Sequence, residues 1–208
     1  KKQTLFSLAI AASVLASCSS KQTENTESNA ALDNIMTRTS IRAYTADSIS
    51  KENIETMLRA AMAAPSAGNK QPWRFVVVEN RATLDSIGAN FGSMKMASQA
   101  PLGIVVCGDL EATFPEEGRD YWIEDTSAAM ENLLLAAHSI GLGAVWCGIY
   151  PMTDRVQAFS EMLSLPENII PMGVAIIGHP QSAQEPKDKW NPEYVHYESW
   201  KKSGAKGF

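Results

Sequence analysis

The chain has 208 residues, of which 45% are hydrophobic and 20% charged, and a formal net charge of −5 at pH 7. This length suits one domain with a core of its own, and the net acidity disfavours nucleic acid as a partner. The three histidines and three cysteines show no metal-ligand spacing, so we expect no metal site. Cys107 and Cys147 lie in apolar runs, which indicates two buried thiols.

Residues 1–17 have the pattern of a secretory signal peptide. Two lysines precede a mostly apolar run, residues 5–15, which is too short for a permanent membrane span. The run leads into Leu15-Ala16-Ser17-Cys18, which resembles a bacterial lipobox, where Cys18 becomes an acylated N-terminus after cleavage. The alternative is an ordinary signal peptide in which this cysteine is incidental.

A lipobox also predicts a location. An acyl chain on Cys18 would tie the protein to the cell envelope, at the outer membrane or the periplasmic face, without spanning a membrane. If the signal is not used, the protein stays in the cytoplasm. Residues 18–30 are rich in Ser, Thr, Asn, Gln and Glu and predict a flexible tether, so that residues 31–208 form the folded domain.

Helices and strands alternate along this domain. Ser50 is a good N-cap for a helix with an apolar stripe, and Pro65 ends that helix. Such alternation predicts an α/β or α+β sheet with helices on its faces. Helices are expected at 31–36, 51–64, 81–89, 120–140 and 153–162, and strands at 75–78, 102–107, 144–149 and 169–177.

The expected helix at 120–140 is the longest, and it is apolar on most of its faces. A helix of this kind lies inside a large core or at a subunit interface. Gly141-Leu142-Gly143 ends it.

Two segments carry the chemistry. Arg38-Thr39-Ser40-Ile41-Arg42 places two guanidinium groups beside hydroxyls, a combination that suits a phosphate. The turn that begins at Pro65 and closes with Gln71-Pro72-Trp73 offers small polar groups, which suit a planar ring with hydrogen-bonding edges. Trp146-Cys147-Gly148 and Lys187-Asp188-Lys189 add to this pattern of ligand binding. The sequence has no nucleophile elbow, P-loop or dinucleotide fingerprint.

In this order, the motifs resemble the nitroreductase family of FMN flavoproteins over residues 32–200. The resemblance implies an α+β fold in α/β/α layers, with a mixed, mostly antiparallel sheet. It implies a homodimer with the 120–140 helix at its interface, and FMN bound between the subunits. The cofactor-binding residues would be Arg38, Thr39, Ser40, Arg42, Pro65, Ser66, Ala67, Asn69, Gln71, Trp146, Cys147, Gly148, Lys187 and Lys189.

The resemblance also implies a role for each group. Arg38, Ser40 and the two lysines would hold the phosphate, and Arg42 would lie near the N1–C2=O edge of the flavin and favour its reduction. Pro65, Ser66, Ala67 and Asn69 would line the ring from the partner subunit, and the alternative for Gln71 is that it serves only the turn. A backbone N–H between Trp146 and Gly148 would face N5.

The reaction implied is ping-pong. NAD(P)H would give hydride to N5, and an electron-poor acceptor such as a nitroaromatic or a quinone would take the electrons, with no catalytic side chain from the protein. Three features depart from the family pattern: Lys187 and Lys189 where arginine is common, Cys147 in place of an acid, and a short stretch between Leu110 and Trp122 that indicates an open or small acceptor pocket.

The signal peptide leaves alternatives open, because nicotinamide cofactors are scarce outside the cytoplasm. One is an oxidoreductase that uses another donor or stays in the cytoplasm. The others are a flavin-binding lipoprotein with little turnover and a reductive dehalogenase of the same fold.

Overall fold

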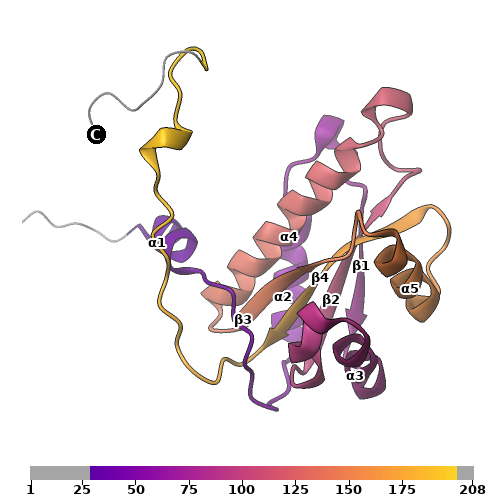
Figure 1. Cartoon of the computed structure of the whole chain (residues 1–208), viewed down its shortest axis with the longest axis vertical. Coiled ribbons are helices and arrows are strands. Elements are labelled where there is room, and N and C mark those ends of the chain that lie inside the picture. The colour runs from indigo at the N-terminus through magenta and orange to yellow at the C-terminus, as the bar shows by residue number, and fades with distance from the viewer. Residues whose placement is uncertain (1–28, 201–208) are drawn as a thin grey trace, which may run out of the picture.

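A computed structural model of the chain describes residues 29–200 (Figure 1). The expected signal peptide, Cys18 and most of the expected tether lie outside these residues. Every helix and strand expected from the sequence is present, with bounds within about two residues of those expected. The elements are α1 (Ala30–Thr37), α2 (Lys51–Met62), β1 (Trp73–Val78), α3 (Arg81–Asn90), β2 (Leu102–Asp109), α4 (Tyr121–Ser139), β3 (Gly143–Gly148), α5 (Thr153–Leu163) and β4 (Ile169–Gly178).

Short 3-10 turns, which the sequence pattern did not predict, join several of these elements. They are η1 (Ala67–Asn69), η2 (Gly92–Ser98), η3 (Glu116–Gly118) and η4 (Pro192–Tyr194). None of the helices in the described part of the chain is long and apolar enough to cross a membrane.

The four strands form one sheet in the order β1-β2-β4-β3, and each pair of neighbours is antiparallel. A bulge between Val106 and Cys107 shifts the register of β2 against β4. Outside the named strands, Ser40 forms an isolated parallel bridge with Ala144 of β3. The prediction of an α+β fold is therefore confirmed, and in the described residues the only parallel pairing is this bridge.

Helices cover both faces of the sheet and make three layers (Figure 1). Leu102, Ile104 and Val106 of β2 pack toward α2 and α4, because alternate side chains of a strand point to opposite faces. Val105 and Cys107 pack toward α3 and α5 on the other face. The two layers of helices thus leave β3 at the open edge of the sheet.

Helix α4 packs on α2 and on the sheet of its own chain, with Met130 and Leu133 fully buried. A stripe at helical spacing, which includes Glu124, Glu131 and His138, faces away from that core and is half-buried or exposed. Helix α1 lies along this stripe, and none of its own residues is buried.

Candidate functional site

The first predicted segment and the tail lie together in one cleft of about 710 Å³, between α1, α4 and the C-terminal segment. It collects six of the predicted residues from positions up to 151 apart in sequence. Four of the six are cations, and three acids also line the walls. The predicted lining residues are Arg38, Thr39, Ser40, Arg42, Lys187 and Lys189, and the acids are Glu131, Glu185 and Asp188.

Contacts between α1 and α4 place Arg38 in this cleft. The side-chain amide of Asn34 donates to the Leu135 carbonyl at 3.1 Å, and Thr37 Oγ1 lies 2.9 Å from His138 Nε2. Arg38 follows at the C-terminal end of α1, where its Nε lies 3.3 Å from Glu131 Oε1. Because its side chain is only 16% exposed, Arg38 presents a well-fixed guanidinium to the cleft.

Burial, with a smaller contribution from the Arg38 guanidinium, lowers the pKa of His138. The imidazole is therefore neutral at neutral pH, and it adds no charge beside Arg38.

Strand β3 runs from this cleft along the open edge of the sheet. The Ile41 N–H donates to the Ala144 carbonyl at 3.0 Å, on the side away from β4. Alternate residues of an antiparallel strand turn their backbone groups to the same side, so Trp146 and Gly148 also face outward. From Ala144 to Gly148 the edge is about 14 Å long, at 3.4 Å per residue.

The last three residues of β3, Trp146, Cys147 and Gly148, lie in different environments. The Trp146 side chain lies against Gly173, where a Cβ would come within 2.5 Å of Trp146 Nε1. The side chain of Cys147 points into the core on the α3 and α5 face, and burial raises its pKa. The carbonyl of Gly148 accepts a hydrogen bond from Arg155 Nη1 at 2.7 Å. The edge therefore offers backbone N–H groups rather than a reactive thiol.

The second predicted segment, residues 65–71, is an exposed turn with a strained backbone. Gly68, Asn69 and Gln71 have φ values of 54°, 54° and 51°, the left-handed region that side chains disfavour. Two hydrogen bonds within the turn hold it: Gln71 N–H donates to Ser66 Oγ at 2.9 Å, and Gln71 Nε2 donates to Asn69 Oδ1 at 3.0 Å. In the described structure, Gln71 therefore stabilises the turn.

Two carboxylates fasten the ends of this turn. Asp125 of α4 accepts the Ala67 N–H at 2.8 Å. At the other end, the Asp109 N–H donates to the Pro72 carbonyl, and its carboxylate accepts bonds from Arg74 at 2.6 Å and from Asn168 at 2.8 Å. Burial works to raise the pKa of Asp109, but these hydrogen bonds and the Arg74 charge outweigh it and hold the pKa below its usual value.

The structure does not bring the two predicted segments into one cleft. None of the residues in the turn at 65–71 lines the cleft that holds Arg38. Arg38 contacts α4 at Glu131 and Ala67 contacts it at Asp125, which is about 9 Å along the helix and about 120° around it. In a single chain, the two predicted parts of the site, called half-sites below, therefore lie apart.

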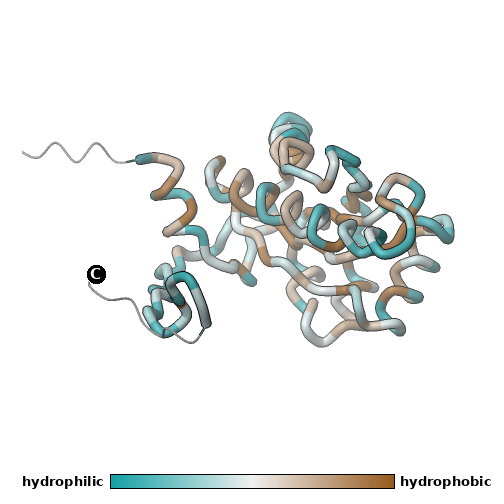
Figure 2. The backbone as a smooth tube through the Cα atoms, turned by 90° about the horizontal axis from the view of Figure 1, so that it is seen from above, coloured by the Kyte–Doolittle hydropathy of each residue, from teal (hydrophilic) through white to brown (hydrophobic). Residues whose placement is uncertain are grey.

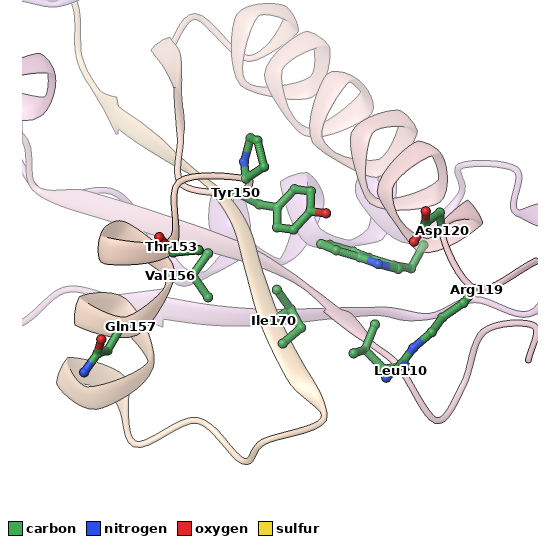
Figure 3. Close-up of a pocket in the computed structure, with 10 residues that line it drawn as sticks. Leu110, Arg119, Asp120, Tyr150, Thr153, Val156, Gln157 and Ile170 are labelled. Atoms are coloured by element: carbon green, nitrogen blue, oxygen red, sulfur yellow. The ribbon is translucent and has the colours of Figure 1, made fainter. Parts of the chain in front are cut away.

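A second cavity, of about 490 Å³, lies beyond the end of β3 (Figure 3). Tyr150 and Trp122 meet edge to face in its wall, with ring centroids 5.0 Å apart. Leu110 and Ile170 complete an apolar floor, and Arg119 reaches across the rim. The sequence pattern did not predict this cavity, because its walls come from α4, α5, β4 and the loops beside them.

Sequence reasoning also missed acids that the fold brings to both half-sites. Nothing in the sequence pattern places Glu131 beside Arg38, since that contact depends on how α1 crosses α4. Asp125 did leave a signal, because it is an acid inside the long, mostly apolar helix expected at 120–140.

Comparison with known proteins identifies the family of the chain. The model of the Nitroreductase family matches residues 35–94 and 88–179. The chain belongs to the nitroreductase family. A protein of Archaeoglobus fulgidus named "Putative NADH dehydrogenase/NAD(P)H nitroreductase" is 45% identical over 170 residues, which cover 80% of this chain and 96% of that protein.

Two solved structures of this family agree with the fold. A protein of the same name from Bacteroides thetaiotaomicron superposes with a TM-score of 0.78 at 46% identity, over 83% of this chain and 99% of that one. A Desulfovibrio desulfuricans protein described as a "putative nitroreductase in complex with fmn" superposes with a TM-score of 0.70 at 32% identity, over 82% and 97% of the two chains. The family resemblance seen in the sequence motifs is therefore confirmed.

Proposed function

We propose that this nitroreductase-family protein is an FMN-dependent oxidoreductase that passes electrons from NAD(P)H to a small, electron-poor acceptor. The observation that carries the proposal is the cleft of cations and hydroxyls at Arg38–Arg42, which continues directly into the open edge of β3. Relatives support it, among them a Bacillus subtilis protein named "FMN reductase [NAD(P)H]", 25% identical over 82% of this chain.

The cleft fits the phosphate of FMN. Arg38 is held by Glu131 and provides a planar donor, while Ser40 and Thr39 provide hydroxyls beside it. Lys187 and Lys189 face them from the C-terminal segment and add two point charges. Four cations against three acids leave the cleft with a net positive charge that favours an anion.

The edge of β3 fits the ring. Backbone groups of Trp146 and Gly148 face outward beyond the Ser40–Ala144 bridge, where they can hydrogen-bond a planar heterocycle. Arg42 is exposed beside this edge and provides a cation for the N1–C2=O side. FMN, when bound, supplies the hydride chemistry at its N5 position, and the protein residues bind and orient it.

A second copy of the chain would complete the site, with its turn at 65–71 covering the ring. The support is that this turn and the phosphate cleft lie apart in one chain, although both are built from residues typical of one FMN site. Helix α1 also stands to one side of the layered body with Leu32, Ile35 and Met36 exposed (Figure 2). Light scattering on the flavin-loaded protein should give a dimer, and a loaded monomer would exclude the shared site.

The acceptor would be a nitroaromatic, a quinone or a similar conjugated compound. The stretch between β2 and α4 forms only the short η3 turn, so the covering segment is small and leaves the site open to such planar molecules. A steady-state screen of nitroaromatics and quinones with NADH and NADPH tests this choice.

We further propose that Cys18 carries the lipid that keeps the protein in the cell envelope. The motif Leu15-Ala16-Ser17-Cys18 supports this. The Cys18→Ser variant should move from the membrane fraction to the soluble fraction, and a membrane-bound variant would contradict the anchor.

The proposed activity is tested by mixing the purified protein with NADH or NADPH under anaerobic conditions. A yellow protein whose absorbance near roughly 450 nm bleaches with either donor supports the enzyme. A yellow protein that does not bleach would be a flavin-binding protein with little turnover. A colourless protein that FMN does not reconstitute would refute the proposal.

A further inference from the structure

Asp125 is a buried acid on α4, behind the turn at 65–71. Only 4% of the residue is exposed, and its Oδ1 accepts the Ala67 N–H at 2.8 Å. Its Oδ2 is buried and finds no hydrogen-bond partner in the described part of the chain.

An arrangement of this kind is costly for folding. A buried carboxylate oxygen without a partner has lost its hydration without replacing it. Buried polar groups in proteins are nearly always satisfied, so an unsatisfied one calls for a reason other than stability.

The hydrogen bond that Oδ1 accepts supplies a reason for placing the carboxylate here. It holds Ala67, the first residue of η1, and the next two residues, Gly68 and Asn69, both have φ of 54°. A strained turn persists only where its surroundings fix it. Within the described residues, the bond from Ala67 is the one side-chain hydrogen bond between the start of this turn and α4.

We propose that Asp125 is a positioning residue that fixes the start of the turn at 65–71 and so sets how this turn lies against the flavin bound by a second copy of the chain. The inference rests on the proposed function. A carboxylate buried behind the turn, when ionised, also disfavours negative charge on the ring side.

The anchor can be tested without flavin. In the flavin-free protein, Asp125→Ala removes the acceptor of the Ala67 N–H, so hydrogen exchange at this amide should accelerate at least tenfold. Asp125→Asn keeps a carbonyl oxygen there, and the exchange rate should stay within a factor of about three of the wild type. Asp85→Asn, on an exposed pair of α3 with Arg81, is the matched control and should change nothing. A wild-type rate of hydrogen exchange at the Ala67 amide in the Asp125→Ala variant would contradict the proposal that Asp125 anchors the turn.

The charge is tested on the flavin-loaded protein. Asp125→Asn should favour the reduced flavin about tenfold, a rise in midpoint potential of about 30 mV for a two-electron couple. Melting temperature should stay level or rise, because the unpaired carboxylate is gone. An unchanged potential together with a large loss of stability would show a structural residue only.

The action across subunits is tested by co-expressing two differently tagged variants, Arg38→Ala and Asp125→Ala. If the half-sites come from different chains, each mixed dimer has one intact site, so about a quarter of all sites should recover the wild-type flavin spectrum at random mixing. No recovery in purified mixed dimers would overturn the proposal. Failure of the wild type to bind FMN would instead refute the proposed function. The rate of hydrogen exchange at Ala67 would still test whether Asp125 anchors the turn.

Discussion

The two half-sites are built in opposite ways. The predicted phosphate cleft is open and charged, and its far wall is the segment at 181–190, whose residues are all exposed. The turn at 65–71 is equally exposed at Gly68–Gln71, but hydrogen bonds within the turn and to Asp125 and Asp109 hold it in a strained shape. The turn is therefore fixed by hydrogen bonds within the chain, whereas the cleft is fixed at Arg38 through Glu131 and is exposed along its far wall.

The largest expected effect is on the cleft. The double variant Arg38→Ala and Arg42→Ala should weaken FMN binding by about 100-fold or more, because hydrogen bonds to charged groups are worth about 1.5–3 kcal/mol each. Stability of the flavin-free protein should fall by no more than about 1 kcal/mol, because Arg42 is exposed and the Glu131 side of the Arg38 pair is 47% exposed. Fluorescence titration with FMN measures the affinity, and Arg59→Ala on the exposed face of α2 is the control. Unchanged affinity would show that the cleft is misassigned.

A substitution that loosens the turn should instead lower the stability of the protein. Asp109→Asn disturbs the bonds to Arg74 and Asn168 at the end of the turn, and we expect a loss of about 2–3 kcal/mol, a value reduced because Arg74 is 47% exposed. Urea unfolding of the flavin-free protein measures it. A loss as small as that of Asp85→Asn would mean that this anchor contributes little.

The Asp109 carboxylate also predicts that the free energy of unfolding depends on pH. The pKa of Asp109 is lower in the folded protein than in the unfolded chain, so its contribution is present above the unfolded pKa and is lost as pH falls through the folded pKa. Unfolding free energy should therefore decrease in acid, and the slope should be shallower in Asp109→Asn. Parallel curves for the two proteins would contradict this assignment.

The smallest effects concern strain in the turn. Gly68→Ala places a Cβ 2.7 Å from Phe114 Cζ at a φ of 54°, and should cost about 1–2 kcal/mol. Gln71→Gly relieves a left-handed side chain but also removes the Nε2 hydrogen bond to Asn69, so the two effects should nearly cancel and leave the stability within about 0.5 kcal/mol of the wild type. Thermal unfolding should therefore shift clearly for Gly68→Ala and hardly at all for Gln71→Gly, and an equal loss in both variants would show that the strain is not where φ places it.

Local pattern was enough to predict the elements of the fold. Ser50 caps α2 through the Asn53 N–H, as its position before an apolar stripe indicated, and the alternation of helices and strands gave the layers. Both buried thiols were also predicted correctly, and burial raises the pKa of Cys107 to about 12, which keeps it inert. The 3-10 turns were missed because they depend on backbone geometry rather than on periodicity.

The sequence by itself determined which residue types suit a ligand, because cations, hydroxyls and a turn of small polar residues keep their chemistry in any fold. Arg38–Arg42 and the lysines of the tail could be named for this reason, and the family resemblance implied that they share one phosphate site. Only the tertiary structure decided that Glu131 holds Arg38 and that Asp125 is buried behind the turn at 65–71. Such contacts join residues 58 or more positions apart, and their distances follow from how helices cross a sheet rather than from any local pattern.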